Sequence, residues 1–562
     1  MKKRIYILLT LLAIYIFVIE YIFYPEYILR QESEGLFLTT NDYLQNYLFT
    51  PGSWILLLTN FIQQFYHSLP LGLFIETILI LSSTISMFLY LQKWEIAHHS
   101  IWIISIPSIM FCVYQNTWGI PALLQYCFTL SMLTFYISIS HQTTRFIYSV
   151  MLLPFLYLLI PSNCFILIYL YMCIYEWTFF KSFTMKIISI SIVLLACLYP
   201  LFWQNINYTS ALLYHFSPEP DMQHVQLYYI LYLLPVIPIL LSKWKGNLYF
   251  SYVLVGFLFI FGSYSIYKSS YCEEKEKRFA IQRYAEEKKW NQILQAISNT
   301  PYENNPFFHP YLMLALNEQR MLPEKLFHYP IFSANQIYFP ANESDNANFN
   351  SLFAYSIGLK QEAIHQLAQA NAMSPHGLSF SRLRRMIDWY IELKNVSLAE
   401  KYLAILQTST CHNQWIKKRI SQLSTIKKDT TFKTNKDFII DASSPLIFLT
   451  QVIKTDTTNR KALDYLLCGI LLGKDLKGFY NVFQAYFPKN TPIPIHYQEA
   501  LLVVDLMFPQ LKVTQQYSIS STCKQAFEEF GKWMAQRPNT NAILKQKYGN
   551  TYWYYGFIRT VT

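Results

Sequence analysis

Three acidic side chains gather near the start of the chain, and their chemistry is the first clue to function. Glu32 and Glu34 stand two residues apart, and Asp42 follows eight residues later. A carboxylate can take a proton from a hydroxyl group, so an acid here could be the general base of a transfer reaction. Arg30 stands beside the pair and offers positive charge to a phosphate leaving group. The plain alternative is that the acids are solvated and that Asp42 only caps a helix.

Two further residues extend this set. Glu76 falls in the second turn of an apolar run, where an ionisable side chain is costly and often functional. His67 ends the helix that precedes this run. The candidate catalytic residues are therefore Glu32, Glu34 and Asp42. The candidate substrate-binding residues are Arg30, Glu76 and His67.

The acids need a backbone that aims them at one place. Glu32 and Glu34 would point to different faces of a regular helix, but to the same side of an extended or turn segment. Gly35 follows them directly and favours such a non-helical stretch. Thr39 is expected to cap a short helix through Phe49, with Asp42 at its third position. A second helix, Trp54–Tyr66, spans about 13 residues and is too short to cross a bilayer.

The composition points to a membrane protein. Of 562 residues, 53% are hydrophobic and 14% are charged, against about 25% charged residues in soluble domains. The mean hydropathy is +0.19. Such a chain is too apolar to be disordered. The sequence predicts an all-α protein with two parts: a polytopic transmembrane domain, residues 1–268, and a helical domain outside the cytoplasm, residues 269–562.

About nine membrane spans are expected. The first, Ile5 to about Tyr24, follows a basic start and lacks a small-residue cleavage site, so it reads as an uncleaved anchor. The other expected spans are Leu71–Leu91, Ile96–Val113, Ile120–Ile139, Phe146–Ile160, Cys164–Phe180, Ile187–Trp203, Gln226–Leu241 and Leu248–Tyr267. Residues 25–70 form the first loop outside, which we call loop one.

The positive charges favour one orientation. Basic residues concentrate in cytoplasmic loops. With the N-terminus inside, the inside loops hold Lys2, Lys3, Arg4, Lys93, Arg145, Lys181, Lys186, Lys243 and Lys245. The short outside loops hold only Arg30. This split predicts a bacterial inner-membrane protein whose C-terminal domain lies in the periplasm.

Helix pairs recur in the second half. The stretch from Tyr355 to Ala370 is echoed from Tyr390 to Leu406, at an offset of about 34 residues, the period of tetratricopeptide-type repeats. We therefore expect an α-solenoid whose stacked pairs share a core. Such arrays bind envelope proteins, or they simply pack on the membrane half. Two basic clusters, Arg382, Arg384 and Arg385, and Lys417, Lys418 and Arg419, could meet phosphates or form a solvated helix face.

Several residues of loop one and the following span carry a resemblance. They are Gln31-Glu32, Leu36-Phe37, Pro51-Gly52, Phe61, Gln64-Phe65-Tyr66 and Leu71-Gly72. The chain resembles an uncharacterised family of multi-pass bacterial membrane proteins, catalogued as a domain of unknown function. This resemblance runs over the whole chain and implies an envelope protein, but it supplies no activity.

The order of elements carries a second, architectural resemblance. The chain is similar to multi-spanning glycosyltransferases of the GT-C type, which take sugars from polyprenyl-phosphate donors. In those enzymes an acid of the first outside loop acts as base or metal ligand, and by position Glu32, Glu34 or Asp42 would match. The Asp-x-Asp signature is absent, and Glu32-Ser33-Glu34 is the nearest form.

Two functions follow as expectations. The first is a glycosyltransferase that uses a lipid-linked sugar at the outer leaflet, with a divalent metal ion as the one candidate cofactor. The second is a non-enzymatic scaffold whose outside domain binds envelope proteins. The bilayer is a partner in both cases, and nucleic acid is not expected outside the cytoplasm. The sequence has no Walker loop, GxGxxG, GxSxG or HExxH, so the enzyme classes that depend on them lose support.

Overall fold

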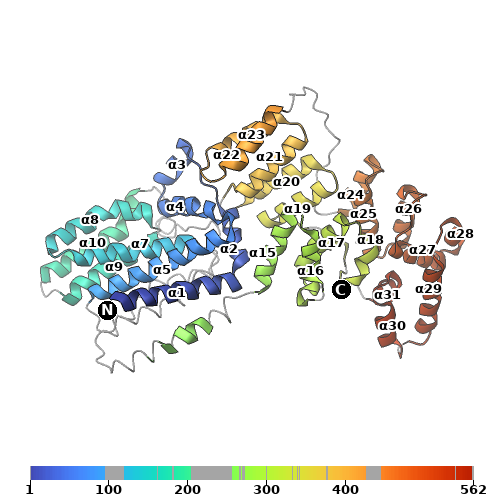
Figure 1. The fold of residues 1–562 in the computed structure, drawn as a ribbon, viewed down its shortest axis with the longest axis horizontal. Coiled ribbons are helices and arrows are strands. Elements are labelled where there is room, and N and C mark those ends of the chain that lie inside the picture. Colours follow the sequence, from blue (N-terminus) through green and yellow to red (C-terminus); the bar gives the residue numbers. More distant parts are fainter. Residues whose placement is uncertain are drawn as a thin grey trace. The chain divides into compact units, whose positions relative to one another are not determined.

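The fold was analysed in a computed structural model of the chain (Figure 1). It describes residues 2–94, 119–160, 162–179, 183–203, scattered positions from 253 to 268, and 273–559 without 299, 332, 338, 341, 375–376, 426–444 and 538. Throughout these ranges the regular structure is helical, with no strand, as the sequence predicts. The predicted spans Ile96–Val113 and Gln226–Leu241, and most of Leu248–Tyr267, lie outside the described residues.

The chain divides into two compact units. Unit one contains Met1–Glu276 together with Pro375–Leu383 and Lys401–Gln422. Unit two contains Lys277–Ser374, Arg384–Glu400 and Leu423–Thr562. The segment from 401 to 422 therefore clusters with the first part of the chain, although more than a hundred residues separate them in sequence.

Long apolar helices form the body of unit one. Within the described ranges, two helices are long and apolar enough to cross a membrane, Tyr6–Phe23 of α1 (Lys2–Phe23) and α5 (Leu69–Lys93). Shorter apolar stretches are Leu123–Ser138, Phe165–Thr178 and Phe183–Tyr199. They belong to α7 (Gly119–Ser138), α9 (Ser162–Phe179) and α10 (Phe183–Trp203). Two helices of the described ranges are thus long and apolar enough to be spans. The expected count of nine spans stays a prediction.

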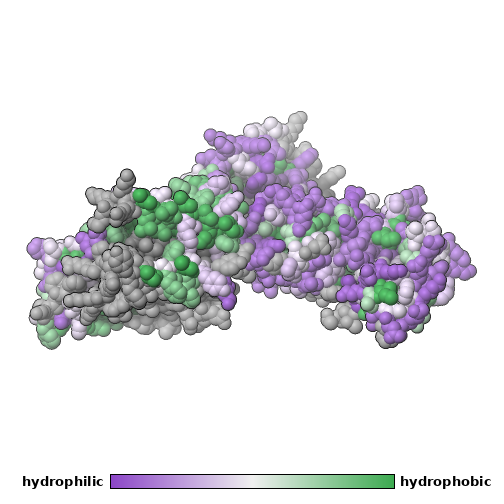
Figure 2. Space-filling view, turned by 60° about the horizontal axis from the view of Figure 1, so that its bottom comes forward, coloured by the Kyte–Doolittle hydropathy of each residue, from purple (hydrophilic) through white to green (hydrophobic). Residues whose placement is uncertain are grey.

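The exposed surface differs in hydropathy between the apolar N-terminal helices and the C-terminal helices. Figure 2 shows hydrophobic residues exposed over the part that holds α1 and α5, and mostly hydrophilic residues over the C-terminal helices. Tyr6, Leu11 and Phe74 are more than half exposed. Large apolar side chains facing outward are typical of helices that meet lipid.

One ion pair lies inside the helix bundle of unit one. Arg145 of α8 (Gln142–Leu159) donates from Nε to Oε1 of Glu176 at 2.7 Å, and both side chains are at most 2% exposed. Tyr136 donates to the same oxygen at 3.0 Å. The sequence pattern places Arg145 in an inside loop before the span Phe146–Ile160, whereas in the structure it lies in the first turn of α8 and pairs with Glu176.

Helix hairpins recur along the second half of the chain. Five helices end in a residue at positive φ, namely Lys288, Arg320, Gly358, Lys394 and Lys474. At each turn this residue's N–H bonds a carbonyl three residues back, and the next N–H bonds a carbonyl five residues back. The longer bond is the six-to-one bond of a Schellman motif. The hairpins join α15 (Glu273–Glu286) to α16 (Trp290–Ile297), α17 (His309–Glu318) to α18 (Leu322–Lys325), α19 (Ser344–Ser356) to α20 (Lys360–Met373), α21 (Phe380–Glu392) to α22 (Val396–Gln407), and α25 (Arg460–Leu472) to α26 (Leu476–Tyr486).

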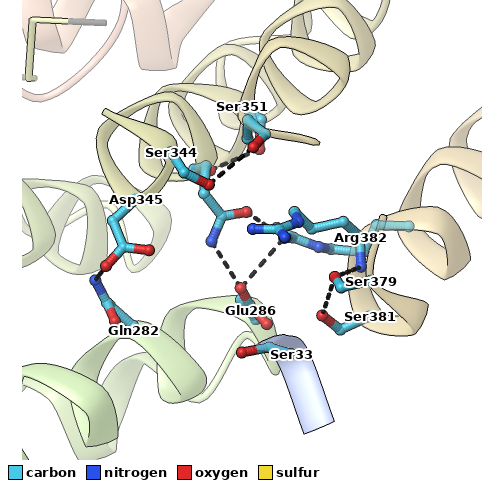
Figure 3. Close-up of polar contacts among 12 residues, drawn as sticks. Ser33, Gln282, Glu286, Ser344, Asp345, Ser351, Ser379, Ser381 and Arg382 are labelled. Atoms are coloured by element: carbon cyan, nitrogen blue, oxygen red, sulfur yellow. Dashed lines mark hydrogen bonds and ion pairs between the residues drawn. The ribbon is translucent and has the colours of Figure 1, made fainter. Parts of the chain in front are cut away.

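Polar contacts join these hairpins at Glu286. Its Oε1 accepts from Asn348 at 2.8 Å and from Arg385 at 3.2 Å. Gln282, one turn earlier, donates to Asp345 at 3.2 Å (Figure 3). In unit one, Arg382 is 8% exposed and donates to the Gly377 carbonyl. The basic cluster predicted on α21 is therefore not a free surface patch, because Arg382 is buried and Arg385 is paired.

Candidate functional site

Loop one folds into short helices between α1 and α5. They are α2 (Pro25–Arg30), η1 (Gln31–Glu34), α3 (Asn41–Leu48), α4 (Ser53–Gln63) and η2 (Gln64–His67). Pro25 occupies the first helical position of α2, where a missing N–H costs nothing. Gly52 takes φ 71° before α4, a conformation that glycine adopts without strain. These local rules explain why the loop turns sharply at both places.

Glycine also lets loop one pack closely on itself. A Cβ at Gly35 would lie 2.6 Å from Asn60 Oδ1 and 2.8 Å from Gln63 Oε1. The backbone after η1 therefore rests directly on the polar face of α4. Gln63 also donates to Gln31 at 3.3 Å, and this contact fixes the start of η1 against the end of α4. The segment that carries Glu32 is thus held by buried amide groups.

Glu32 lies beside His412 at the edge of loop one, and His412 lies beside His67. Glu32 Oε1 lies 3.8 Å from Nε2 of His412, a residue almost four hundred positions later in the chain. Glu32 is 20% exposed and His412 is 9% exposed. The His67 ring stands edge-on to the His412 ring, with 6.4 Å between centroids. One carboxylate and two imidazoles therefore share a partly open position, which is a set suited to proton transfer.

The His412 ring is held from its other side. Phe380 stacks on it with centroids 3.3 Å apart and planes 6° apart. Trp415 meets Phe380 edge-on at 5.6 Å. Stacking restricts rotation of the imidazole, so His412 presents Nε2 toward Glu32 in a fixed direction. An oriented partner of this kind is what a carboxylate base requires.

Three hydrogen bonds attach loop one to the residues before His412. Thr39 donates to the Thr408 carbonyl from its backbone N–H at 3.0 Å and from its hydroxyl at 2.9 Å. Thr410 donates to Gln64 Oε1 at 3.0 Å. These bonds show that loop one and residues 408–412 form one structure within unit one.

Two backbone predictions for loop one are wrong. Glu32 and Glu34 lie in the short helix η1, not in an extended or turn segment, so alternate residues do not share a side there. Thr39 does not cap α3, because its hydroxyl is bound to Thr408 and the capping position is Thr40, which makes no side-chain cap bond. The local sequence patterns at Gly35 and at Thr39 therefore did not predict the backbone of this segment, and Thr39 is bound instead to a residue far away in the sequence.

The remaining candidates lie in different surroundings. Asp42 is exposed in the first turn of α3, and His67 is exposed at the end of η2. Arg30 is half-buried at the last position of α2. The backbone of Glu34 ends η1, and its side chain lies outside the described residues. Glu32 and His67 thus both lie beside His412, whereas Asp42 is exposed on another helix.

Glu76 lies beneath loop one and not on its surface. It is 1% exposed, and Tyr66 of η2 donates to its Oε2 at 2.5 Å. Burial, followed by the neighbouring Glu76 carboxylate, raises the pKa of the Tyr66 hydroxyl well above its usual range. Tyr66 therefore stays a hydrogen-bond donor to Glu76 at all ordinary pH values.

Sequence reasoning missed His412 and Phe380. The signal that could have found them is weak: a His and an aromatic ring in a helical domain are ordinary core residues. The sequence also has Glu219, Asp221 and His224 in the loop Gln204–Val225, residue types that can bind a metal, but this loop lies outside the described residues. In the ranges that the structure does describe, no group of three or more His, Cys, Asp or Glu is arranged to hold a metal ion.

Comparisons with known proteins give a family but no activity. The chain matches, over residues 1–559, a family described as a family of unknown function, DUF6057. No curated protein and no solved structure matches the chain. The resemblance to an uncharacterised family, inferred from the residues of loop one, is confirmed by this match, whereas the similarity to glycosyltransferases is not shown by it.

Proposed function

The chain belongs to this family of unknown function, and we propose that it is a multi-pass protein of the bacterial inner membrane that transfers a sugar from a lipid-linked donor. In this proposal loop one and the C-terminal domain lie outside the cytoplasm. The reaction takes place at the outer leaflet, in the synthesis of an envelope glycan. The observation that carries the proposal is the Glu32–His412–His67 set, a carboxylate and two imidazoles at a partly open edge of loop one.

The proposed step is an inverting transfer. An acceptor hydroxyl attacks the anomeric carbon, its proton passes to Glu32, and the bond from that carbon to the phosphate oxygen breaks. The phosphate leaves with the electron pair and needs positive charge or hydrogen-bond donors. His67 and Arg30 are the candidates of loop one for that role. His412 positions Glu32 through the contact of 3.8 Å.

The experiment is a set of variants in a deletion strain that has a surface-glycan phenotype. Glu32→Gln keeps the shape of the side chain but removes the proton acceptor, so transfer should fall by about 10²–10⁴. The membrane abundance of the protein should stay normal, because a partly exposed acid contributes little to stability. Glu400→Gln, at an exposed position of α22, is the matched control and should behave like the parent.

The second candidate function is an envelope scaffold. The observation that favours it is the series of five hairpins with the same turn geometry, which we read as an α-solenoid related to tetratricopeptide arrays. In that case the surfaces of the stacked helices bind envelope proteins, and no residue of loop one takes part in a reaction. Normal glycan in Glu32→Gln, Glu34→Gln and Asp42→Asn cells would contradict the transferase and favour the scaffold.

A further inference from the structure

A buried histidine of unit two has one nitrogen without a partner. His496 lies in the first turn of α27 (Ile495–Met507), a helix that packs on α18, on α29 (Ser521–Met534) and on α31 (Tyr552–Phe557) (Figure 1). Its side chain is 2% exposed, and Nδ1 lies 2.8 Å from Oε2 of Glu499 in the same helix. Nε2 is buried and has no hydrogen-bond partner in the part of the chain that the structure describes. Such a nitrogen is disfavoured, so this ring is a candidate for binding a further group.

Glu499 determines which nitrogen of the His496 ring carries the hydrogen. It is 3% exposed, and its Oε2 also accepts the backbone N–H of Tyr552 at 2.7 Å. Because this carboxylate oxygen acts as an acceptor, Nδ1 of the ring donates to it and Nε2 presents a lone pair. The same arrangement, in which a carboxylate holds an imidazole by one nitrogen, orients metal-binding histidines through the other nitrogen.

A second imidazole lies beside the first. His328 ends η6 (Leu326–His328), the turn that follows α18, and its ring centroid is 5.9 Å from that of His496. Metal–nitrogen bonds of about 2.0–2.1 Å place two imidazoles of one ion with centroids roughly 4.5–6.5 Å apart. The observed distance falls within this range. His328 is exposed, so an ion can reach the pair from solvent.

The groups around the two rings suit a cation that is shielded on one side. Phe327 is 1% exposed and stands edge-on to His496 with 4.9 Å between centroids, so an apolar ring closes that side. Glu324 Oε2 accepts the backbone N–H of the residue before His496 at 3.2 Å. With Glu499, two carboxylates thus flank the pair, and Lys325 opposes them with one positive charge.

We propose that His496 and His328 bind a divalent transition-metal ion, with His496 Nε2 as the buried ligand and water completing the coordination shell. Imidazole is a preferred ligand of Zn²⁺, Ni²⁺ and Cu²⁺, and Cu²⁺ binds most tightly in the general order of affinities. Glu499 is a positioning residue, since it touches the imidazole and not the ion. An occupied site links η6 to α27 and, through Tyr552, to α31, so it stabilises the packing of these elements. The site is separate from the Glu32 set and does not depend on the transferase proposal.

The test titrates the full chain, without an affinity tag, with Cu²⁺ in lipid nanodiscs. The chain has other histidines, among them the adjacent pair His98-His99, so the measured quantity is the difference between parent and variant. His328→Gln removes one ligand at an exposed position, so the variant should bind one equivalent of Cu²⁺ fewer, or bind it about tenfold or more weakly. The difference between the electron paramagnetic resonance spectra of parent and variant should show copper coupled to two imidazole nitrogens.

Two further variants test the roles separately. His365 of α20 is the matched control, because it is 59% exposed and also pairs with a glutamate, 3.3 Å from Glu362, so His365→Gln should bind Cu²⁺ like the parent. In Glu499→Gln the amide oxygen can still accept both N–H groups but is a weaker acceptor, so the affinity should fall by about 10–100-fold. Zn²⁺ should also raise the Tm of the parent more than that of His328→Gln, since it binds the folded state. Equal copper stoichiometry and affinity in the parent and His328→Gln overturn the proposal.

Discussion

Gly35 determines how closely the first acids of loop one approach the helix beneath them. Its φ is −161°, an extended conformation that any residue can adopt. The position therefore favours glycine because there is no room for a side chain, not because of its backbone angle. Gly35→Ala would place a methyl group 2.6 Å from Asn60 Oδ1 and 2.8 Å from Gln63 Oε1. Both amides are buried, so we expect a loss of stability of about 1–3 kcal/mol, as in overpacked cores. A lower Tm in nanodiscs would show it.

The control for this change is another glycine. Gly531, within α29, has nothing within 4 Å of a Cβ placed on it. Gly531→Ala should therefore raise stability by about 0.5–1 kcal/mol, because alanine favours a helix interior. Equal Tm values for Gly35→Ala and the parent would mean that the contact between η1 and α4 is looser than described.

The candidate site illustrates what single residues reveal in a sequence. Glu32 and His67 could be selected because an acid and a histidine stand out in a sparsely charged half of the chain. His412 could not, because its role depends on Phe380 and on a contact with a residue nearly four hundred positions away. Glu76 could be selected as an ionisable residue in an apolar run, but its hydrogen bond from Tyr66 depends on how η2 folds back, which no local sequence pattern specifies.

At the scale of elements, the start of helix α2 is held by a distant acid. Glu276 of α15 accepts the backbone N–H groups of Glu26 at 3.0 Å and of Tyr27 at 3.2 Å. It thereby satisfies donors that the first turn of a helix leaves open. Burial raises the pKa of Glu276 to about 7, against an ordinary value of 4.5, although these two hydrogen bonds act in the opposite direction.

The raised pKa gives a pH dependence with a definite sign. Between about pH 4.5 and 7 the folded state binds a proton that the unfolded chain releases, so stability falls as the pH rises through this window. In Glu276→Gln, an amide oxygen can still accept both N–H groups, but nothing titrates. We expect the Tm of this variant to vary less with pH than that of the parent, and to exceed it above about pH 7.

An acid on the same helix provides the comparison. Glu273 is exposed in the first turn of α15, so Glu273→Gln should leave the pH dependence of the parent nearly unchanged. A Glu276→Gln protein whose Tm follows the parent curve from about pH 5 to about pH 8 would show that this carboxyl does not titrate in the window.

The hairpin turns are the elements that the sequence predicted best. The echo between the stretches that start at Tyr355 and Tyr390 predicts two similar helix pairs, and each pair turns at a residue of positive φ, Gly358 and Lys394. A Schellman turn is a local structure, so its signal is contained in a few neighbouring residues. Helix bounds were likewise close, as for α5, predicted as Leu71–Leu91 and observed as Leu69–Lys93.

At the scale of the whole molecule, two late segments of the chain pack with its first part. Residues 375–383 and 401–422 cluster with the first 276 residues, while the residues between them belong to unit two. Hydrophobic periodicity reports only which face of a helix is buried, not against what it packs. For this reason the sequence pattern predicts the helices of this region but not their partner in loop one.

This packing gives a prediction about the side of the membrane on which residues 408–410 lie. Loop one is bound to Thr408 and Thr410, so both segments must lie on the same side, whatever the number of spans between them. α5 begins on that side at Leu69 and, as a span, ends on the other side at Lys93. The charge pattern of the sequence predicts a cytoplasmic N-terminus, and on that prediction loop one and the C-terminal half are expected outside. A reporter active only outside the cytoplasm should therefore be silent when fused after Lys93 and active when fused after Phe557. Equal activity of the two fusions, or a silent C-terminal fusion beside an active one after Lys93, would contradict this topology.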